Sequence, residues 1–280
     1  MVWYENAGIG VKFMAAGIIG FHQWLDTPAG HYLLDWERQQ FDRAVGDIFG
    51  YHALQLGLSE LPSLQANRMP HRWLAIHESQ GAMQTSLSHP SAKSGDEWTN
   101  ANLMTDFSVL PFPANSLDLV VLPHTLELSV DPHATLREVA RVLVPEGKVL
   151  ICGFNPVSLW GLRQRSSHGL ERMGWGERFL PQTRELIGYG RLRDWLRLLS
   201  CEVESGYFGC HRPALNNQKW LQRLAWMDKA GAQAWPFFGA VYFLTAVKRE
   251  RSMRLLGSAW KTIPARVKMT APVANRTRDF

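Results

Sequence analysis

The chain contains few cysteines and no long apolar segment. Its 280 residues include only three cysteines, Cys152, Cys201 and Cys210. Their spacing fits neither a zinc site nor a disulfide framework, so we expect reduced thiols in a cytoplasmic protein that binds no metal. No apolar run reaches the roughly 18 residues that a membrane-spanning helix needs, and we expect no membrane association.

The nearest approach to such a run is residues 13–21, FMAAGIIGF, which follow Lys12. A secretory signal requires a basic leading region and a cleavage site of small residues. Glu5 and the bulky sequence from Phe21 to Trp24 argue against one. We therefore expect residues 1–22 to be an N-terminal extension, packed on the domain as a helix or a loose end.

Positive charge is concentrated at the C-terminal end of the chain. Residues 248–280 hold nine Lys and Arg residues against Glu250 and Asp279, a net charge of +7. Because the whole chain carries +5, residues 1–247 carry −2. A basic tail attracts phosphate nonspecifically, but tails of this composition are often simply disordered. We predict a flexible basic tail over residues 251–280, with nucleic acid as an alternative partner that is not favoured.

Alternating helix and strand patterns predict an α/β domain over residues 23–250. Residues 22–49 carry apolar side chains at helical spacing, with charges such as Asp35 and Glu37 between them, which predicts an amphipathic helix. Thr27 would cap this helix and Pro28 would occupy its first turn. Strands are predicted at residues 51–57, 71–76, 117–122 and 148–153. The last two flank a helix over residues 131–147 in a right-handed βαβ unit.

Residues 154–183 interrupt this alternation. Their glycines and prolines are mixed with Arg163, Arg165, Arg172 and Arg178, which predicts an irregular excursion. These arginines could bind an anionic acceptor, although a solvated charged face is the more common explanation. After them we expect a helix over residues 192–199, strands over 202–207 and 240–247, and an aromatic-rich helical segment between these strands.

One continuous motif resembles a known family. The run from Asp106 to Glu127, DFSVLPFPANSLDLVVLPHTLE, is similar to the middle of the type 11 methyltransferases, a bacterial group of the class I S-adenosylmethionine-dependent enzymes. The match continues in register through Asp131-Pro132 and the helix that follows, as far as Ile151, and a looser match extends from Gly50 to Val247. The resemblance implies a Rossmann-like, doubly wound sheet. This sheet would be mostly parallel with an antiparallel last strand, and helices would cover both faces.

The same resemblance implies where S-adenosyl-L-methionine would bind. In open parallel sheets, ligands bind outside the carboxyl ends of the strands, near the point where strand order reverses. The family's position matching Asp106 lies beside the adenine, and Phe107 follows it in the same site. An acid after the second strand would bind the ribose hydroxyls. Glu78 is the candidate, and His77 could take the same place through a ring nitrogen.

The loop after the first strand departs from the family pattern. An acidic residue before a Gly-x-Gly-x-Gly turn is expected there, so that the backbone can approach the methionine end of the cofactor. Of the three glycines only Gly57 is present, Gln55 stands where an acid is common, and Leu61 stands at the third glycine. The cofactor is then either held at a greater distance or not held at all.

Methyl transfer needs aligned partners, and a base only where the acceptor carries a proton. The family often has a histidine where His124 stands, at the mouth of the active site. His124 is thus the candidate catalytic residue, as a base or as a group that orients the acceptor, although bonding to a neighbouring loop is an equally good explanation. Glu127 would cap or orient the next helix, and Asp118, at the opposite end of its strand, would be structural.

The sequence therefore predicts an S-adenosylmethionine-dependent methyltransferase that acts on an unidentified acceptor, most simply a small molecule. The first alternative is a catalytically inactive binding protein with the methyltransferase fold. A nucleic-acid methylase is less favoured, because Asn155-Pro156 lacks the aromatic partner of the base-methylase motif. A nicotinamide dehydrogenase is least favoured, because the glycines that pyrophosphate requires do not follow Gly57.

Overall fold

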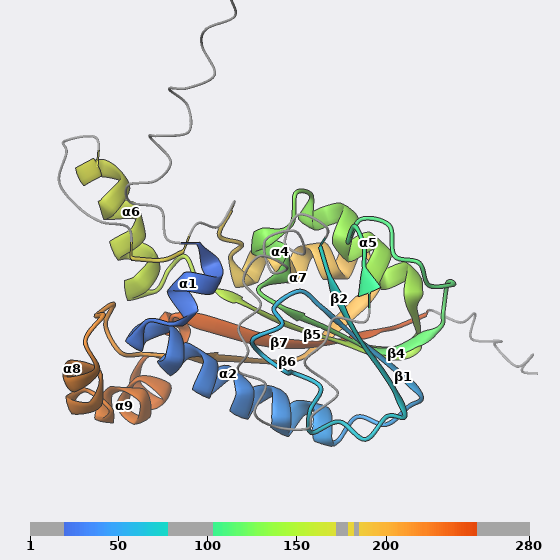
Figure 1. Ribbon diagram of the computed structural model, residues 1–280, viewed down its shortest axis with the longest axis horizontal. Coiled ribbons are helices and arrows are strands. Elements are labelled where there is room, and N and C mark those ends of the chain that lie inside the picture. Colours follow the sequence, from blue (N-terminus) through green and yellow to red (C-terminus); the bar gives the residue numbers. More distant parts are fainter. Residues whose placement is uncertain (1–19, 78–102, 172–178, 182–184, 251–280) are drawn as a thin grey trace, which may run out of the picture. The chain divides into compact units, whose positions relative to one another are not determined.

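The computed structural model describes residues 20–77, 103–171, 179–181 and 185–250 (Figure 1). The chain divides into two compact units, residues 1–250 and 251–280, and every described element belongs to the first. The predicted tail and residues 1–19 of the predicted extension lie outside the described residues. No helix in the described part of the chain is long and apolar enough to cross a membrane.

Seven strands form one sheet in the order β3-β2-β1-β4-β5-β7-β6. The pairs that link β1, β2, β3, β4 and β5 are parallel, and β7 is antiparallel to both of its neighbours, β5 and β6. The strands are β1 (His52–Leu56), β2 (His71–Ile76), β3 (Leu103–Met104), β4 (Leu117–Pro123), β5 (Leu143–Phe154), β6 (Cys201–Gly209) and β7 (Val241–Lys248). This order and the antiparallel last strand confirm the predicted fold class.

Helices cover both faces of the sheet (Figure 1). They are α1 (Phe21–Leu25), α2 (Pro28–Gly46), α4 (Thr125–Leu128), α5 (Pro132–Val142), α6 (Leu159–Glu171), α7 (Tyr189–Leu198), α8 (Gln218–Arg223) and α9 (Trp226–Ala234), with a short 3-10 turn, η3, at Pro236–Phe238. One apolar cluster joins α1 and α2 to one face through residues such as Phe41 and Phe243. A second cluster joins α5 and α7 to the other face through Val139 and Leu192.

Local signals in the sequence explain several of the helix and strand ends. Thr27 caps α2 as predicted, because its Oγ1 accepts a hydrogen bond from the Gly30 backbone nitrogen at 3.1 Å. Asp131 caps α5 in the same way, by accepting from the backbone nitrogens of His133 and Ala134. Asp118 accepts from the backbone nitrogens of Tyr51 and His52 at 2.8 and 2.9 Å, at the end of β4 opposite the expected ligand edge.

Two predicted elements are wrong. The helix expected over residues 131–147 ends at Val142, because Leu143 already pairs with Leu117 as the start of β5. The irregular excursion expected over residues 154–183 contains α6. Its glycine Gly161 faces the Pro156 carbonyl at a separation that leaves no room for a Cβ, so this glycine permits close packing and does not break the chain.

Candidate functional site

The carboxyl ends of the parallel strands meet at one edge of the sheet, where the sequence places the site. Leu56, Ile76, Met104 and Pro123 are the last residues of β1, β2, β3 and β4. The chain turns sharply after β1, because Gly57 and Leu58 have φ values of 76° and 41°. Glycine adopts this left-handed conformation readily, whereas Leu58 adopts it at a cost in free energy.

Asp106 and His77 lie together after β3 and β2. The Asp106 Oδ1 atom is 3.8 Å from the His77 Nε2 atom, and the Asp106 side chain is 61% exposed. Oδ1 also accepts a hydrogen bond from the Ser108 backbone nitrogen at 2.9 Å, and this bond lowers the pKa of Asp106 below its usual value. Asp106 is therefore an ionised carboxylate that is open to a ligand at this edge.

Phe107 forms the wall next to this carboxylate. It is buried, its ring meets the His77 ring edge to face at 5.4 Å between centroids, and it also faces Gly57. A Cβ on Gly57 would lie 3.8 Å from the Phe107 ring, an ordinary contact. The structure thus brings together three of the four predicted cofactor residues, Gly57, Asp106 and Phe107, whereas Glu78 lies outside the described residues.

Gln55 organises the loop where the family pattern is lost. Its buried Nε2 atom lies within donor distance of the carbonyls of Gly57, Leu58 and Leu61, at 3.2, 2.8 and 2.8 Å. Its Oε1 atom accepts from the Ser63 backbone nitrogen at 3.0 Å. A carboxylate could not donate to these carbonyls, so glutamine at this position ties the loop to itself and not to a ligand.

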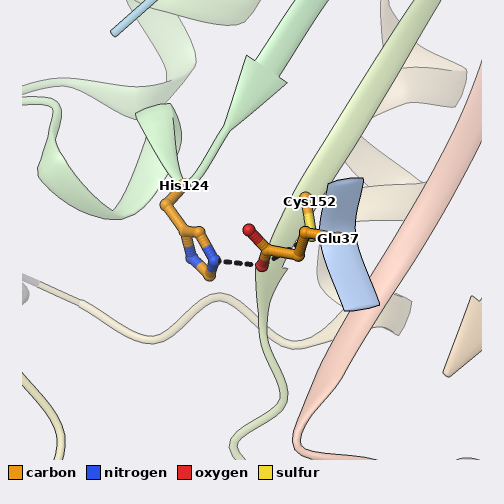
Figure 2. Close-up of side chains that lie close together, drawn as sticks. All are labelled: Glu37, His124 and Cys152. Atoms are coloured by element: carbon orange, nitrogen blue, oxygen red, sulfur yellow. Dashed lines mark hydrogen bonds and ion pairs between the residues drawn. The ribbon is translucent and has the colours of Figure 1, made fainter. Parts of the chain in front are cut away.

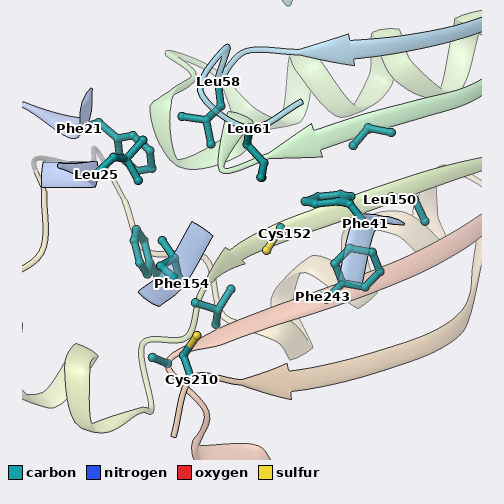
Figure 3. Packing of buried hydrophobic residues seen from close by; sticks show 14 of the residues in the cluster. Phe21, Leu25, Phe41, Leu58, Leu61, Leu150, Cys152, Phe154, Cys210 and Phe243 are labelled. Carbon is teal, nitrogen blue, oxygen red and sulfur yellow. The ribbon is translucent and has the colours of Figure 1, made fainter. Parts of the chain in front are cut away.

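Apolar side chains close the region around this loop (Figure 3). Leu58 is 1% exposed and Leu61 is fully buried, and both belong to the cluster that contains Phe21 and Leu25 of α1. His22 of α1 forms an ion pair with Glu60 of the loop. The residues that replace the second half of the glycine-rich turn are thus buried, and the ion pair joins their loop to α1.

His124 is enclosed at the end of β4 and does not line an open site. Its side chain is 0% exposed, and its Nε2 and Nδ1 atoms lie 2.6 Å from Glu37 Oε1 and 2.8 Å from Glu127 Oε2. Burial lowers the pKa of His124, but the charges of Glu37 and Glu127 outweigh burial and raise it to about 10. A protonated, enclosed imidazole cannot accept a proton from an acceptor, so the geometry argues against the predicted role of a base and favours bonding to its neighbours.

Glu37 and Glu127 both have roles that their positions in the sequence did not indicate. Glu127 does not cap a helix, because it bonds to His124 and accepts from the Phe154 backbone nitrogen. Glu37 lies among the charged positions of α2 but is fully buried. Helical spacing does place this glutamate on the buried face of α2, four residues after Leu33 and four before Phe41, but the spacing gives no sign of the partner that its charge meets there.

The predicted arginine cluster is not assembled as one group in the described part of the chain. Arg163 of α6 donates to the Ala214 carbonyl and lies over the Phe179 ring, 4.8 Å from its centroid. Arg165, also in α6, is exposed. Arg172 and Arg178 lie outside the described residues.

A cavity of about 790 Å³ opens beyond the end of β6. Polar and aromatic side chains of α2, α8 and α9 line it, together with the segment that follows β6. In its wall, Arg212 pairs with Asp228 at 2.9 Å and lies over the Tyr32 ring at 4.2 Å. β6 ends at the same edge of the sheet as β5, because Gly209 and Phe154 both pair with Val241. The cavity therefore lies at the edge where the other strands end.

Part of the chain matches a protein family model, and a longer part is similar to one curated protein. Residues 66–151 match the type 11 family described as "Methyltransferase domain". The uncharacterized protein YafS of Escherichia coli K12 is 30% identical over 181 residues, which are 64% of this chain and 65% of that protein. The chain thus matches slightly less than two thirds of the length of this curated relative.

Two solved structures are similar to the chain. One is described as "Complex between the Haloferax volcanii Trm112 methyltransferase activator and the putative methyltransferase"; it has 16% identity and a TM-score of 0.51, with 83% of this chain and 97% of that chain covered. The other is an S-adenosylmethionine-dependent methyltransferase of Mesorhizobium loti, with 14% identity and a TM-score of 0.46, covering 76% of this chain and 99% of that chain. The first likeness shows a common fold.

Proposed function

We propose that this chain, whose residues 66–151 match the type 11 methyltransferase family, transfers a methyl group from S-adenosyl-L-methionine to an acceptor. The observation that supports this most directly is Asp106. It lies at the carboxyl edge of a sheet with the methyltransferase strand order, and its carboxylate is exposed. An exposed, ionised carboxylate at this position can accept a hydrogen bond from the exocyclic amine of adenine.

The residues at this edge fit the adenosine half of the cofactor. Asp106 would hold the adenine amine, and Phe107 would form the apolar wall beside the base. His77, partly buried and next to both, would bind the ribose hydroxyls, and Glu78 is the other candidate from its place in the sequence. When bound, the cofactor supplies a methyl group already activated on a sulfonium, so the main task left to the protein is to align the acceptor.

The methionine half of the cofactor would fit only after α1 and the loop that contains Leu58 move apart. Leu58 and Leu61 have almost no accessible surface, and they belong to the same apolar cluster as Phe21 and Leu25 of α1. For the cofactor to reach the turn at Gly57, α1 and the loop that contains Leu58 must separate. Because the His22–Glu60 ion pair joins these two segments, it opposes this separation.

The acceptor is proposed to be a small molecule bound in the cavity beyond β6. Its volume of about 790 Å³ lies in the range of small-molecule pockets, which is roughly 300–1,000 Å³. Nucleic acid bound through the basic tail is a less favoured partner. Three free, buried cysteines, Cys152, Cys201 and Cys210, support a cytoplasmic location.

The decisive experiment is calorimetric titration with S-adenosylmethionine and its demethylated product. We expect the wild-type protein to bind both, and Asp106→Ala to weaken binding about tenfold or more, because a charge-assisted hydrogen bond contributes about 1.5–3 kcal/mol. Asp194→Ala, which removes an exposed carboxylate of α7, is the matched control and should bind as the wild type does. Binding that survives Asp106→Ala refutes this placement of adenine.

The second candidate is a catalytically inactive binding protein with this fold. Gln55 favours it, because the amide is fully used inside the loop and no acid replaces it. The same titration separates the two functions. If neither heat nor a thermal shift accompanies the addition of S-adenosylmethionine, the chain does not use this cofactor and the enzyme proposal is abandoned.

A further inference from the structure

Three side chains from distant parts of the sequence meet in the core (Figure 2). Glu37 of α2, His124 at the end of β4 and Cys152 of β5 each offer an atom that binds metals, and these atoms all lie within 4.8 Å of one another. His124 Nε2 is 2.6 Å from Glu37 Oε1, and Cys152 Sγ is 3.2 Å from the same oxygen. All three residues are buried.

One atom of this cluster lacks a partner. No hydrogen-bond donor in the described part of the chain reaches the buried Glu37 Oε2 atom. A carboxylate oxygen buried without a partner is costly, so buried charges are nearly always paired or bound to metals. Apolar packing alone thus gives no reason for a glutamate at this position of α2.

The other nitrogen of the imidazole is already fixed. Glu127 Oε2 lies 2.8 Å from His124 Nδ1, and the Phe154 backbone nitrogen holds the second oxygen of Glu127. A carboxylate that bonds one ring nitrogen of a histidine orients the other nitrogen toward a metal, an arrangement found beside most metal-bound histidines. The bond from Glu127 therefore fixes the orientation of the His124 ring, and the Nε2 atom of this ring points at Glu37.

We propose that Glu37, His124 and Cys152 form a structural binding site for a zinc-type divalent cation. Imidazole, thiolate and carboxylate together are the ligand types that zinc prefers. In a tetrahedral zinc site neighbouring ligand atoms are roughly 3.3–3.6 Å apart, which follows from metal–ligand lengths of about 2.0–2.3 Å. The present His124–Glu37 separation is shorter than this, and rotation of the Glu37 carboxylate lets the cation enter between the two atoms.

The cation replaces protons. When it binds, the Cys152 thiol and the Nε2 atom of His124 each release a proton to solvent, so both become electron-pair donors to the metal.

The predicted role is to hold elements together and not to catalyse. The ligands join α2, the end of β4 and the middle of the sheet, and none of them has a surface at which an acceptor could bind. Sequence inspection predicted no metal site because the three cysteines do not form a zinc spacing. Here only one cysteine is needed, and the other ligands lie 115 and 28 positions from it in the sequence.

Cobalt provides a probe that does not depend on activity or on S-adenosylmethionine. The full-length protein is produced in zinc-supplemented and in cobalt-supplemented medium and analysed for bound metal and for its absorption spectrum. We expect about one equivalent of metal, and in the cobalt form a near-ultraviolet band from thiolate-to-cobalt charge transfer. Cys152→Ser should lose this band, whereas Cys201→Ser, a buried cysteine of β6 outside the site, should keep it.

The wild-type protein alone can overturn the proposal. If it contains no metal after either preparation and develops no thiolate band when refolded with cobalt, the cluster is a metal-free network of hydrogen bonds. A band that persists in a folded Cys152→Ser variant contradicts the ligand assignment. Since neither measurement involves the methyl donor, a failure here leaves the proposed methyltransferase function to its own test.

Discussion

The side-chain amide of Gln55 and the backbone carbonyl of Leu61 are 2.8 Å apart, so the residue at the usual acidic position bonds to the residue at the usual third glycine. The same Nε2 atom also lies close to the carbonyls of Gly57 and Leu58. Gln55→Glu would place a buried carboxylate against these carbonyl oxygens.

We expect Gln55→Glu to lower the free energy of unfolding by about 3 kcal/mol, since breaking buried hydrogen bonds and burying an unpaired charge both destabilise. Urea denaturation at neutral pH measures this change. Gln65→Glu, at an exposed position of the same loop, is the control and should have little effect. Equal stabilities of the two variants would show that the Gln55 bonds are dispensable.

Asp118 should matter for stability and not for the ligand. Its Oδ2 atom accepts from two backbone nitrogens at the start of β1, and Asp118→Ala leaves both without this partner. We expect a loss of about 1–3 kcal/mol in the free energy of unfolding. The dissociation constant for S-adenosylmethionine should stay within about twofold in the folded variant. Asp118 lies near the amino end of β4, whereas Asp106 lies at the edge of the sheet where the carboxyl ends of the strands meet. A large loss of affinity would contradict this separation.

Much of the fold could be predicted because its signals are local. The apolar run of β4, the cap at Thr27 and the cap at Asp131 each specify their element from neighbouring residues, and all three are present. Pro145 and Gly147, residue types that commonly end helices, favoured a helix end near residue 147, and the actual boundary between α5 and β5 lies earlier. Pairing with Leu117, a distant residue, determines where that strand begins.

The site was predicted less completely, for a physical reason. Asp106 lies at a strand end, and strand ends fix which edge of a sheet a residue occupies, so its exposure there could be expected. Helical spacing puts Glu37 on the buried face of α2, but its contact with His124 depends on where α2 docks, and the burial of Leu58 depends on packing with distant segments. The chain brings these segments together only in the folded state, and no local pattern encodes the contact.

The His22–Glu60 pair should make stability depend on pH. Hydrogen bonding and charge from Glu60 raise the pKa of His22. Burial raises the pKa of Glu60, but the bond and charge of His22 outweigh burial and lower it. The stabilisation from His22 is therefore complete below its unfolded pKa of about 6.5 and is lost as the pH rises through the folded value, while that from Glu60 is lost as the pH falls below about 4.5.

The comparison of wild type with Glu60→Gln isolates this contribution. We expect the wild type to be more stable by about 0.5–1 kcal/mol between about pH 5 and 6.5, and the difference to shrink toward pH 9. Thermal unfolding of both proteins at unit pH steps measures it. A difference that is constant over the whole range would exclude the ion pair as its source.

Weakening the same ion pair should improve binding of the cofactor. In the proposed binding mode the methionine half enters when α1 separates from the loop that contains Leu58, so the apparent affinity is proportional to the fraction of molecules that are open. If Glu60→Gln destabilises the closed form by about 0.6 kcal/mol, the affinity for S-adenosylmethionine should rise about threefold at pH 6. Glu202→Gln removes an exposed carboxylate near the amino end of β6, away from the edge where the carboxyl ends of the strands meet. This variant should leave the affinity unchanged. If calorimetry shows equal or weaker binding by Glu60→Gln, α1 does not restrict access to the turn at Gly57, and the methionine half must bind by another route.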